Sequence, residues 1–123
     1  MANPNIINAT SILGKTVFDA DVAVTASAIV TNAASSGKIL KVNSLIIANI
    51  DGTSAADITA TIRNAAGSVT NSTIANTVSV PNDATLVLLS KDTSIYLEED
   101  MSIYLAASAA GDLSATCSYD EIS

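Results

Sequence analysis

The 123-residue sequence contains no histidine and no tryptophan, and its only cysteine is Cys117. Histidine and activated cysteine perform most proton transfer and nucleophilic chemistry near neutral pH. Arg63 is the only arginine and the four lysines are dispersed, so clustered cations are absent too. The composition predicts a protein that is not an enzyme, with no catalytic residues and no cofactor.

Positive charge is also scarce. Five lysine and arginine residues stand against twelve acidic ones, which gives a net charge of −7. Nucleic acids and anionic membranes bind lysine and arginine gathered on one face, so neither is an expected partner. No apolar stretch approaches the roughly 20 residues of a membrane span, and the first residues lack the cationic segment of a signal peptide. We therefore expect the chain to stay in the cytoplasm in which it is made.

What the chain does have is a series of short apolar or alternating runs separated by Gly, Asn, Asp, Ser or Pro. This spacing predicts an antiparallel β-sandwich of jelly-roll type, and the chain length suits one domain, which we place at residues 14–123. The expected strands cover residues 15–18, 22–31, 39–49, 57–64, 69–74, 77–80, 84–90, 94–98, 101–108 and 113–119.

Two of these strands, around residues 45–48 and 86–89, are apolar on both faces. A sheet of a lone sandwich has one face toward solvent, so the second face of such a strand needs a cover. A loop, the N-terminal residues or another subunit could supply it. We favour another subunit, with Ile47 as a contact residue.

The tetrapeptide Ser-Ile-Tyr-Leu occurs twice, at residues 94–97 and 102–105. A hairpin with a three-residue loop at 99–101 would put both Ile/Leu pairs on one face and set Tyr96 opposite Tyr104 on the other. Such a tyrosine pair is either a packing feature or part of an interaction surface.

The first thirteen residues carry isoleucines and a leucine without the regularity of a strand. They predict an extended N-terminal arm, residues 1–13, which becomes ordered against a neighbour. Its apolar side chains, Ile6, Ile7, Ile12 and Leu13, are the candidate anchors to another subunit.

Acidic residues offer one further possibility. Asp19 and Asp21 lie two apart, so in extended backbone both carboxylates face the same side and could hold Ca²⁺ for a metal-assisted hydrolase. The alternating ligand pattern of a calcium loop is missing, and solvated turn carboxylates explain the pair equally well. We predict no metal site.

Three stretches of the sequence belong together: Met-Ala-Asn-Pro-Asn-Ile-Ile-Asn with Ser-Ile-Leu-Gly-Lys at residues 11–15, the segment 41–53, and the tail from 96–99 through 118–123. Together they resemble a family of small virion structural proteins from tailed bacteriophages of marine bacteria and cyanobacteria. The resemblance implies a capsid decoration (cement) protein on the outer capsid surface. It would bind the major capsid protein across neighbouring subunits as a homotrimer. A tail, neck or fibre-tip module, including one that binds the host, is the alternative.

Overall fold

The computed structural model describes residues 3–123, which form nine strands and two short 3-10 helices. In chain order the elements are η1 (Ile6–Asn8), β1 (Ile12–Asp19), β2 (Ser27–Asn32), β3 (Ile39–Asn49), β4 (Ala56–Arg63), β5 (Thr70–Val80), β6 (Thr85–Leu89), η2 (Lys91–Thr93), β7 (Ile95–Leu97), β8 (Met101–Ala107) and β9 (Leu113–Ile122).

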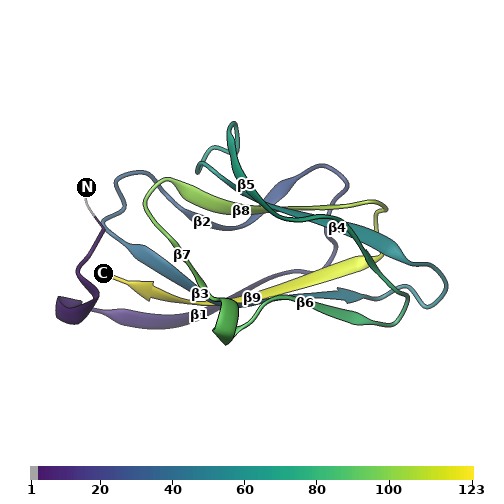
Figure 1. Cartoon of the computed structure of the whole chain (residues 1–123), viewed down its shortest axis with the longest axis horizontal. Coiled ribbons are helices and arrows are strands. Elements are labelled where there is room, and N and C mark those ends of the chain that lie inside the picture. Colours follow the sequence, from purple (N-terminus) through teal and green to yellow (C-terminus); the bar gives the residue numbers. More distant parts are fainter. Residues whose placement is uncertain (1–2) are drawn as a thin grey trace.

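The strands build two antiparallel sheets that pack face to face (Figure 1). Sheet A has the order β1-β9-β3-β6, with β7 paired to the first part of β3, and sheet B has the order β2-β8-β4-β5. The chain passes repeatedly from one sheet to the other, and this strand order is that of a jelly roll. The predicted all-β antiparallel sandwich is confirmed.

Every second side chain along each strand points between the two sheets, and these side chains form the core. In β9 the inward residues Leu113, Ala115 and Cys117 are fully buried, and in β4 the inward residues Ile58 and Ala60 are as well. Alanine and valine occupy as many positions of the core as leucine and isoleucine, and the strands that contribute the small side chains bury modest apolar area.

The predicted hairpin between the two Ser-Ile-Tyr-Leu repeats is wrong. Strand β7 pairs with β3 in sheet A, with Leu97 opposite Leu40, whereas β8 pairs with β2 and β4 in sheet B. Residues 98–100 thus carry the chain between the sheets. Both repeats point their leucines inward, Leu97 from one sheet and Leu105 from the other, so the same alternation serves two separate strands.

Two strand boundaries also differ from the sequence prediction. The expected strand 22–31 shortens to β2, because residues 20–26 connect the two sheets and the Val22 amide donates to the Leu113 carbonyl (2.8 Å). The expected strands 69–74 and 77–80 form one strand, β5. Its irregular point is Thr77, which has a φ of 47°.

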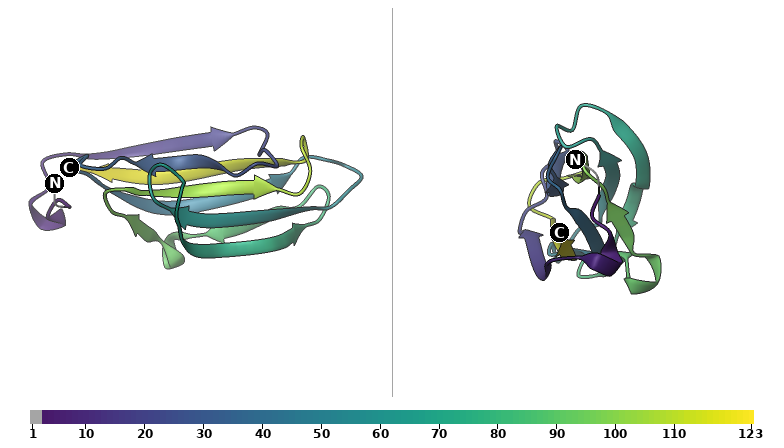
Figure 2. Two further views of the ribbon diagram at one scale, coloured as in Figure 1. Left: turned by 90° about the horizontal axis from the view of Figure 1, so that it is seen from above. Right: turned by 90° about the vertical axis from the view of Figure 1, so that its left-hand side faces the viewer.

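The N-terminal residues lie against their own sandwich. Strand β1 begins at Ile12, opposite Ile122, so the predicted boundary between arm and body at residue 13 falls inside a strand. Ahead of it, the Thr10 amide donates to the Ser123 carbonyl (2.6 Å), and Asn3 Nδ2 donates to Glu98 Oε1 (2.6 Å). Residues 1 and 2 of the predicted arm lie outside the described residues. The first described residues and the C-terminus lie at the same end of the elongated molecule (Figures 1 and 2).

Candidate interaction surface

Several large apolar side chains near the start of the chain are exposed. Five of the eleven among the described residues lie within the first eighteen positions: Ile6, Ile7, Ile12, Leu13 and Phe18. Ile7 is 91% exposed and Phe18 is 77% exposed. We call these five residues the N-terminal apolar surface. These residues follow one another along the chain from η1 to the end of β1, and exposed apolar side chains of this size are candidates for contact with another protein.

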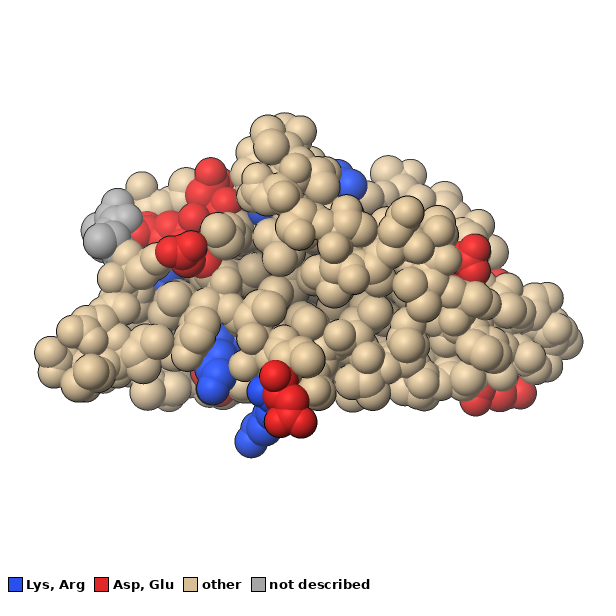
Figure 3. Space-filling view, viewed as in Figure 1, with Lys and Arg blue, Asp and Glu red and all other residues tan. Residues whose placement is uncertain are grey.

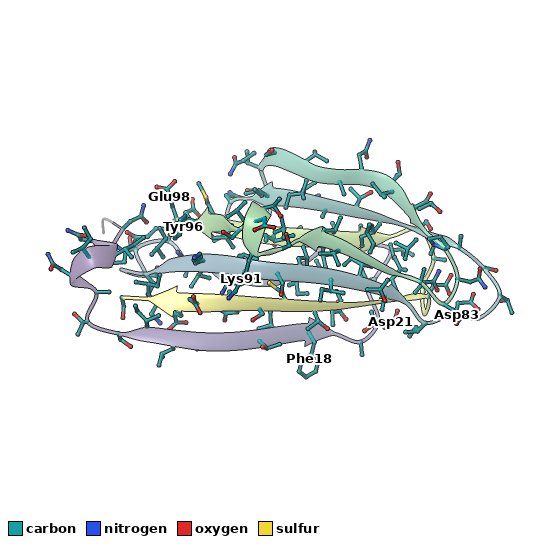
Figure 4. All side chains as sticks on the ribbon, turned by 60° about the horizontal axis from the view of Figure 1, so that its bottom comes forward. Phe18, Asp21, Asp83, Lys91, Tyr96 and Glu98 are labelled. Carbon is teal, nitrogen blue, oxygen red and sulfur yellow. The ribbon has the colours of Figure 1, made fainter. Side chains whose placement is uncertain are left out.

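Strand β1 carries three of these residues along one edge of sheet A. Each of its eight residues has a partner in β9, from Ile12↔Ile122 to Asp19↔Ala115, without a register shift. Among residues 3–123, no strand pairs with the other edge of β1. The alternation places Leu13 and Val17 on the inner face of the sheet and Ile12 and Phe18 on the outer face. In Figure 4 the ring of Phe18 projects from β1 away from the rest of the molecule.

A small ion-pair cluster lies beside this edge. Lys15 Nζ is 2.9 Å from Glu121 Oε2, and Lys38 Nζ is 3.0 Å from Glu121 Oε1. The hydrogen bonds from Lys15 and Lys38 lower the pKa of Glu121, and the hydrogen bond to Glu121 raises the pKa of Lys15. The only cation along β1 is therefore held by a carboxylate of the neighbouring strand.

The predicted contact residues divide into two groups. Ile6 and Leu13 are about half exposed, and Ile7 and Ile12 more so, so all four are accessible. Ile47 is fully buried between the sheets, so the contact predicted for it does not fit its position. The outward residues of this part of β3 are Ile46 and Ala48, which are half-buried.

The tyrosines do not form the predicted cross-strand pair. Tyr96 extends outward from β7 in sheet A and is 46% exposed. Tyr104 extends outward from β8 in sheet B, where the Arg63 guanidinium carbon lies 4.9 Å from its ring centroid. Tyr119 is buried. The three rings therefore do not build a common aromatic platform.

The carboxylates of Asp19 and Asp21 accept backbone hydrogen bonds at the β1 end of the sandwich. Asp19 Oδ1 accepts from the Asp21 amide (3.1 Å), and Asp21 Oδ1 accepts from the Gly111 amide (2.7 Å). No group of three or more Cys, Asp or Glu side chains within residues 3–123 is arranged to hold a metal ion.

The described surface shows no pocket. Charged side chains are scattered over the face drawn in Figure 3, with a wide uncharged area in its middle. Strand β5 lies within residues 64–82, a stretch without a single charged residue. None of the helices in the described part of the chain is long and apolar enough to cross a membrane.

Cys117 lies in the middle of β9 and is fully buried. Burial in apolar surroundings raises the pKa of its thiol to about 12. Because the thiolate is the reactive form, this cysteine is inert in the folded chain.

Phe18 is the surface residue that sequence reasoning missed. The run Thr-Val-Phe-Asp at residues 16–19 is apolar at two adjacent positions, so one of the two must face away from the core. That pattern was the available signal, but it does not reveal which of Val17 and Phe18 faces outward.

Comparison with known proteins finds a similar fold. No family model and no curated protein matches the sequence. A solved structure described as "Bacillus endospore appendages form a novel family of disulfide-linked pili" has 17% sequence identity to this chain and a TM-score of 0.52. The similarity covers 100% of this chain and 96% of that one. At this identity the comparison shows a shared β-sandwich fold.

Proposed function

We propose that the protein is a non-enzymatic structural subunit that binds neighbouring protein subunits in a larger assembly. The observation that carries the proposal is the N-terminal apolar surface, where Ile7 and Phe18 are largely exposed to solvent. Exposed apolar side chains gain roughly 25 cal/mol per Å² when a partner covers them, which offsets the cost of ordering.

The specific assembly that we propose is the outer shell of a tailed bacteriophage, with this chain as a capsid decoration protein on the major capsid protein. The family resemblance of the sequence supports this choice. The net charge of −7 also suits a protein that must not adhere to packaged DNA. Many copies on one shell make a weak individual contact sufficient. The homotrimer expected from the resemblance belongs to the same proposal.

A filament is the second candidate, because the similar fold belongs to a pilus described as disulfide-linked. The buried thiol of Cys117 argues against the same linkage here, since it is not accessible to a neighbouring chain. A filament of this protein would need non-covalent contacts. Electron microscopy of the concentrated purified chain tests this candidate directly: filaments would favour it over the capsid proposal.

The capsid proposal is tested by cryo-electron microscopy of purified virions that contain this chain. Density for the sandwich on the outer shell is the expected result, and density in the tail or neck would contradict it. A binding assay then tests the surface: Ile6→Asp with Ile7→Asp should abolish co-sedimentation with capsids. The matched control is Val69→Asp, which changes an exposed apolar residue elsewhere and should leave binding intact. Unchanged binding of the double variant would contradict a role for the N-terminal residues.

A further inference from the structure

The apolar residues of β1 are arranged symmetrically about Lys15. Ile12 and Phe18 lie three positions to either side of it, and Leu13 and Val17 lie two positions to either side. Because the members of each pair are an even number of positions apart, both members share a face of the sheet. We propose that β1 pairs antiparallel with β1 of a second copy of this chain, with Lys15 opposite Lys15 of the partner subunit.

Strand β1 is the edge best suited to such pairing. Its register with β9 is unbroken over eight residues, so its free edge presents a regular row of backbone groups. The other long edge, β5, is interrupted by three register shifts and by Thr77 in the left-handed region. Strand β2 has a shift between Ala28 and Val30, and β6 has only five residues and a shift against β3. Proteins commonly protect sheet edges by such irregularities, and β1 has none of them.

The symmetry of β1 identifies the partner as a second copy. In the proposed register Ile12 meets Phe18 of the partner subunit, and Leu13 meets Val17 of the partner subunit. Pairing would cover part of Ile12 (58% exposed), Leu13 (49%) and Phe18 (77%) at once. A two-fold axis repeats each of these residue pairs, so the surface of β1 is complementary to the same surface of the second copy. Sheet A would then continue from β6 of one copy to β6 of the other.

The charge at the axis is only partly compensated within each copy. A charge in the middle of an edge strand usually discourages pairing, and two lysines would face each other here. Each Lys15 is 2.9 Å from its own Glu121, but Lys38 is 3.0 Å from the same carboxylate, so each copy brings a cluster with one excess positive charge to the axis. The repulsion that remains between the two clusters weakens the dimer.

The size of the contact predicts a weak dimer. Eight strand residues span about 27 Å, and a sheet with its side chains is about 10 Å thick. The edge of β1 would therefore bury on the order of 300 Å² per copy. That area is below the standard interface, so association should depend on concentration and be strongest where copies are crowded. The β1 contact does not rest on the capsid proposal. It is two-fold, so it cannot be the contact that builds the homotrimer of that proposal; a trimer in solution would therefore contradict β1 pairing and leave the capsid proposal standing.

Sedimentation equilibrium of the full chain, from about 10 μM to about 1 mM, tests the proposal. We expect a monomer–dimer equilibrium. Phe18→Glu should weaken the dimer about a hundredfold, because two buried phenylalanine contacts are lost per dimer. Ile12→Lys should weaken it as well. The double variant Ile12→Lys/Phe18→Glu should recover part of the affinity, because the new lysine of one copy faces the new glutamate of the other. Ile50→Glu, a change at an exposed residue outside β1, is the control that should leave the dimer unchanged.

A cysteine cross-link locates the axis independently. Lys15→Cys should form a disulfide-linked dimer under mild oxidation, because position 15 faces itself, whereas Ile50→Cys should not. A monomer at every concentration, a trimer, or a dimer insensitive to Phe18→Glu would overturn the proposal. Failure of the double variant to recover affinity would overturn the register. Loss of capsid binding by the Ile6/Ile7 variant with the dimer intact would separate this contact from the proposed function.

Discussion

At the scale of single residues, two glycines with positive φ allow two costs of a substitution by alanine to be measured separately. One is the free energy of holding a side-chain-bearing residue at positive φ, and the other is the overlap of the new Cβ with its neighbours. Gly67 has a φ of 78°, and a Cβ there would overlap the ring of Tyr104, on which the Arg63 guanidinium also packs. Gly111 has a φ of 83° and open space around it. The two glycines thus share one conformational requirement but differ in their surroundings.

Gly111→Ala should therefore cost only the left-handed conformation, about 1–2 kcal/mol, whereas Gly67→Ala should cost more. Urea denaturation of both variants measures the difference. In a Tyr104→Ala background the extra cost of Gly67→Ala should disappear, because the overlapping ring is gone. Equal costs for the two glycines would show that Tyr104 moves aside freely.

Glu121 gives the stability of the protein a defined pH dependence. Its pKa is lowered below the ordinary value of 4.5 by hydrogen bonds from Lys15 and Lys38. A lowered carboxyl pKa contributes stability above the ordinary pKa and loses it as the pH falls through the folded-state pKa. Glu121→Gln should therefore lower the melting temperature at pH 7 and have no such effect at about pH 2. Lys38→Met should reproduce part of the loss at pH 7. A Glu121→Gln effect that is equal at both pH values would mean that the ion pair is not its cause.

At the scale of elements, the two Ser-Ile-Tyr-Leu repeats behave alike although they lie in different sheets. Leu97 and Leu105 are buried on opposite sides of the core, while Tyr96 is half exposed. Leu97→Ala and Leu105→Ala should each cost about 2–5 kcal/mol by leaving a cavity. Tyr96→Ala should cost less than about 1 kcal/mol. Urea denaturation measures all three, and a Tyr96→Ala cost as large as that of Leu97→Ala would contradict the outward position of Tyr96.

Strand ends are joined to distant elements by two buried asparagines. Asn32 Nδ2 donates to the Leu97 carbonyl (3.0 Å), and Asn49 Nδ2 donates to the Val80 carbonyl (2.9 Å). The partners are far apart along the chain, so the sequence does not show these two hydrogen bonds. Their role is decided by the packing of the sheets.

At the scale of the whole molecule, the residues ahead of β1 are expected to contribute little to stability. Removal of residues 1–9 deletes η1 and the bond from Asn3 to Glu98, both at the exposed tip. It should cost about 1 kcal/mol or less, since an exposed hydrogen bond contributes little. Removal of residues 1–13 also deletes the start of β1 and the bonds of Thr10 and Ser11 to Ser123, so it should cost clearly more. Thermal unfolding compares the two truncations, and equal losses would contradict the assignment of Ile12 and Leu13 to the sandwich.

The all-β class follows from the amino-acid sequence alone, because alternation in strands such as residues 58–63 and the breakers between runs are local properties. The distribution of charge and of apolar residues along the chain is equally local, and it drew attention to Ile6, Ile7, Ile12 and Leu13. These predictions depend on neighbours within a few residues.

Strand pairing, and the face of the sheet that each residue takes, depend on the tertiary structure. In β3 a register shift between Val42 and Ser44 reverses the alternation, so Leu40 and Val42 face inward before it and Leu45 and Ile47 face inward after it. A strict alternation of faces along the sequence does not show that reversal. Ile47 was predicted as a contact residue because residues 45–48 are apolar on both faces, and such a run does not reveal which of its side chains point inward. The partner of each strand, likewise, depends on contacts between residues far apart in the chain, which is why two adjacent repeats lie in opposite sheets rather than in one hairpin.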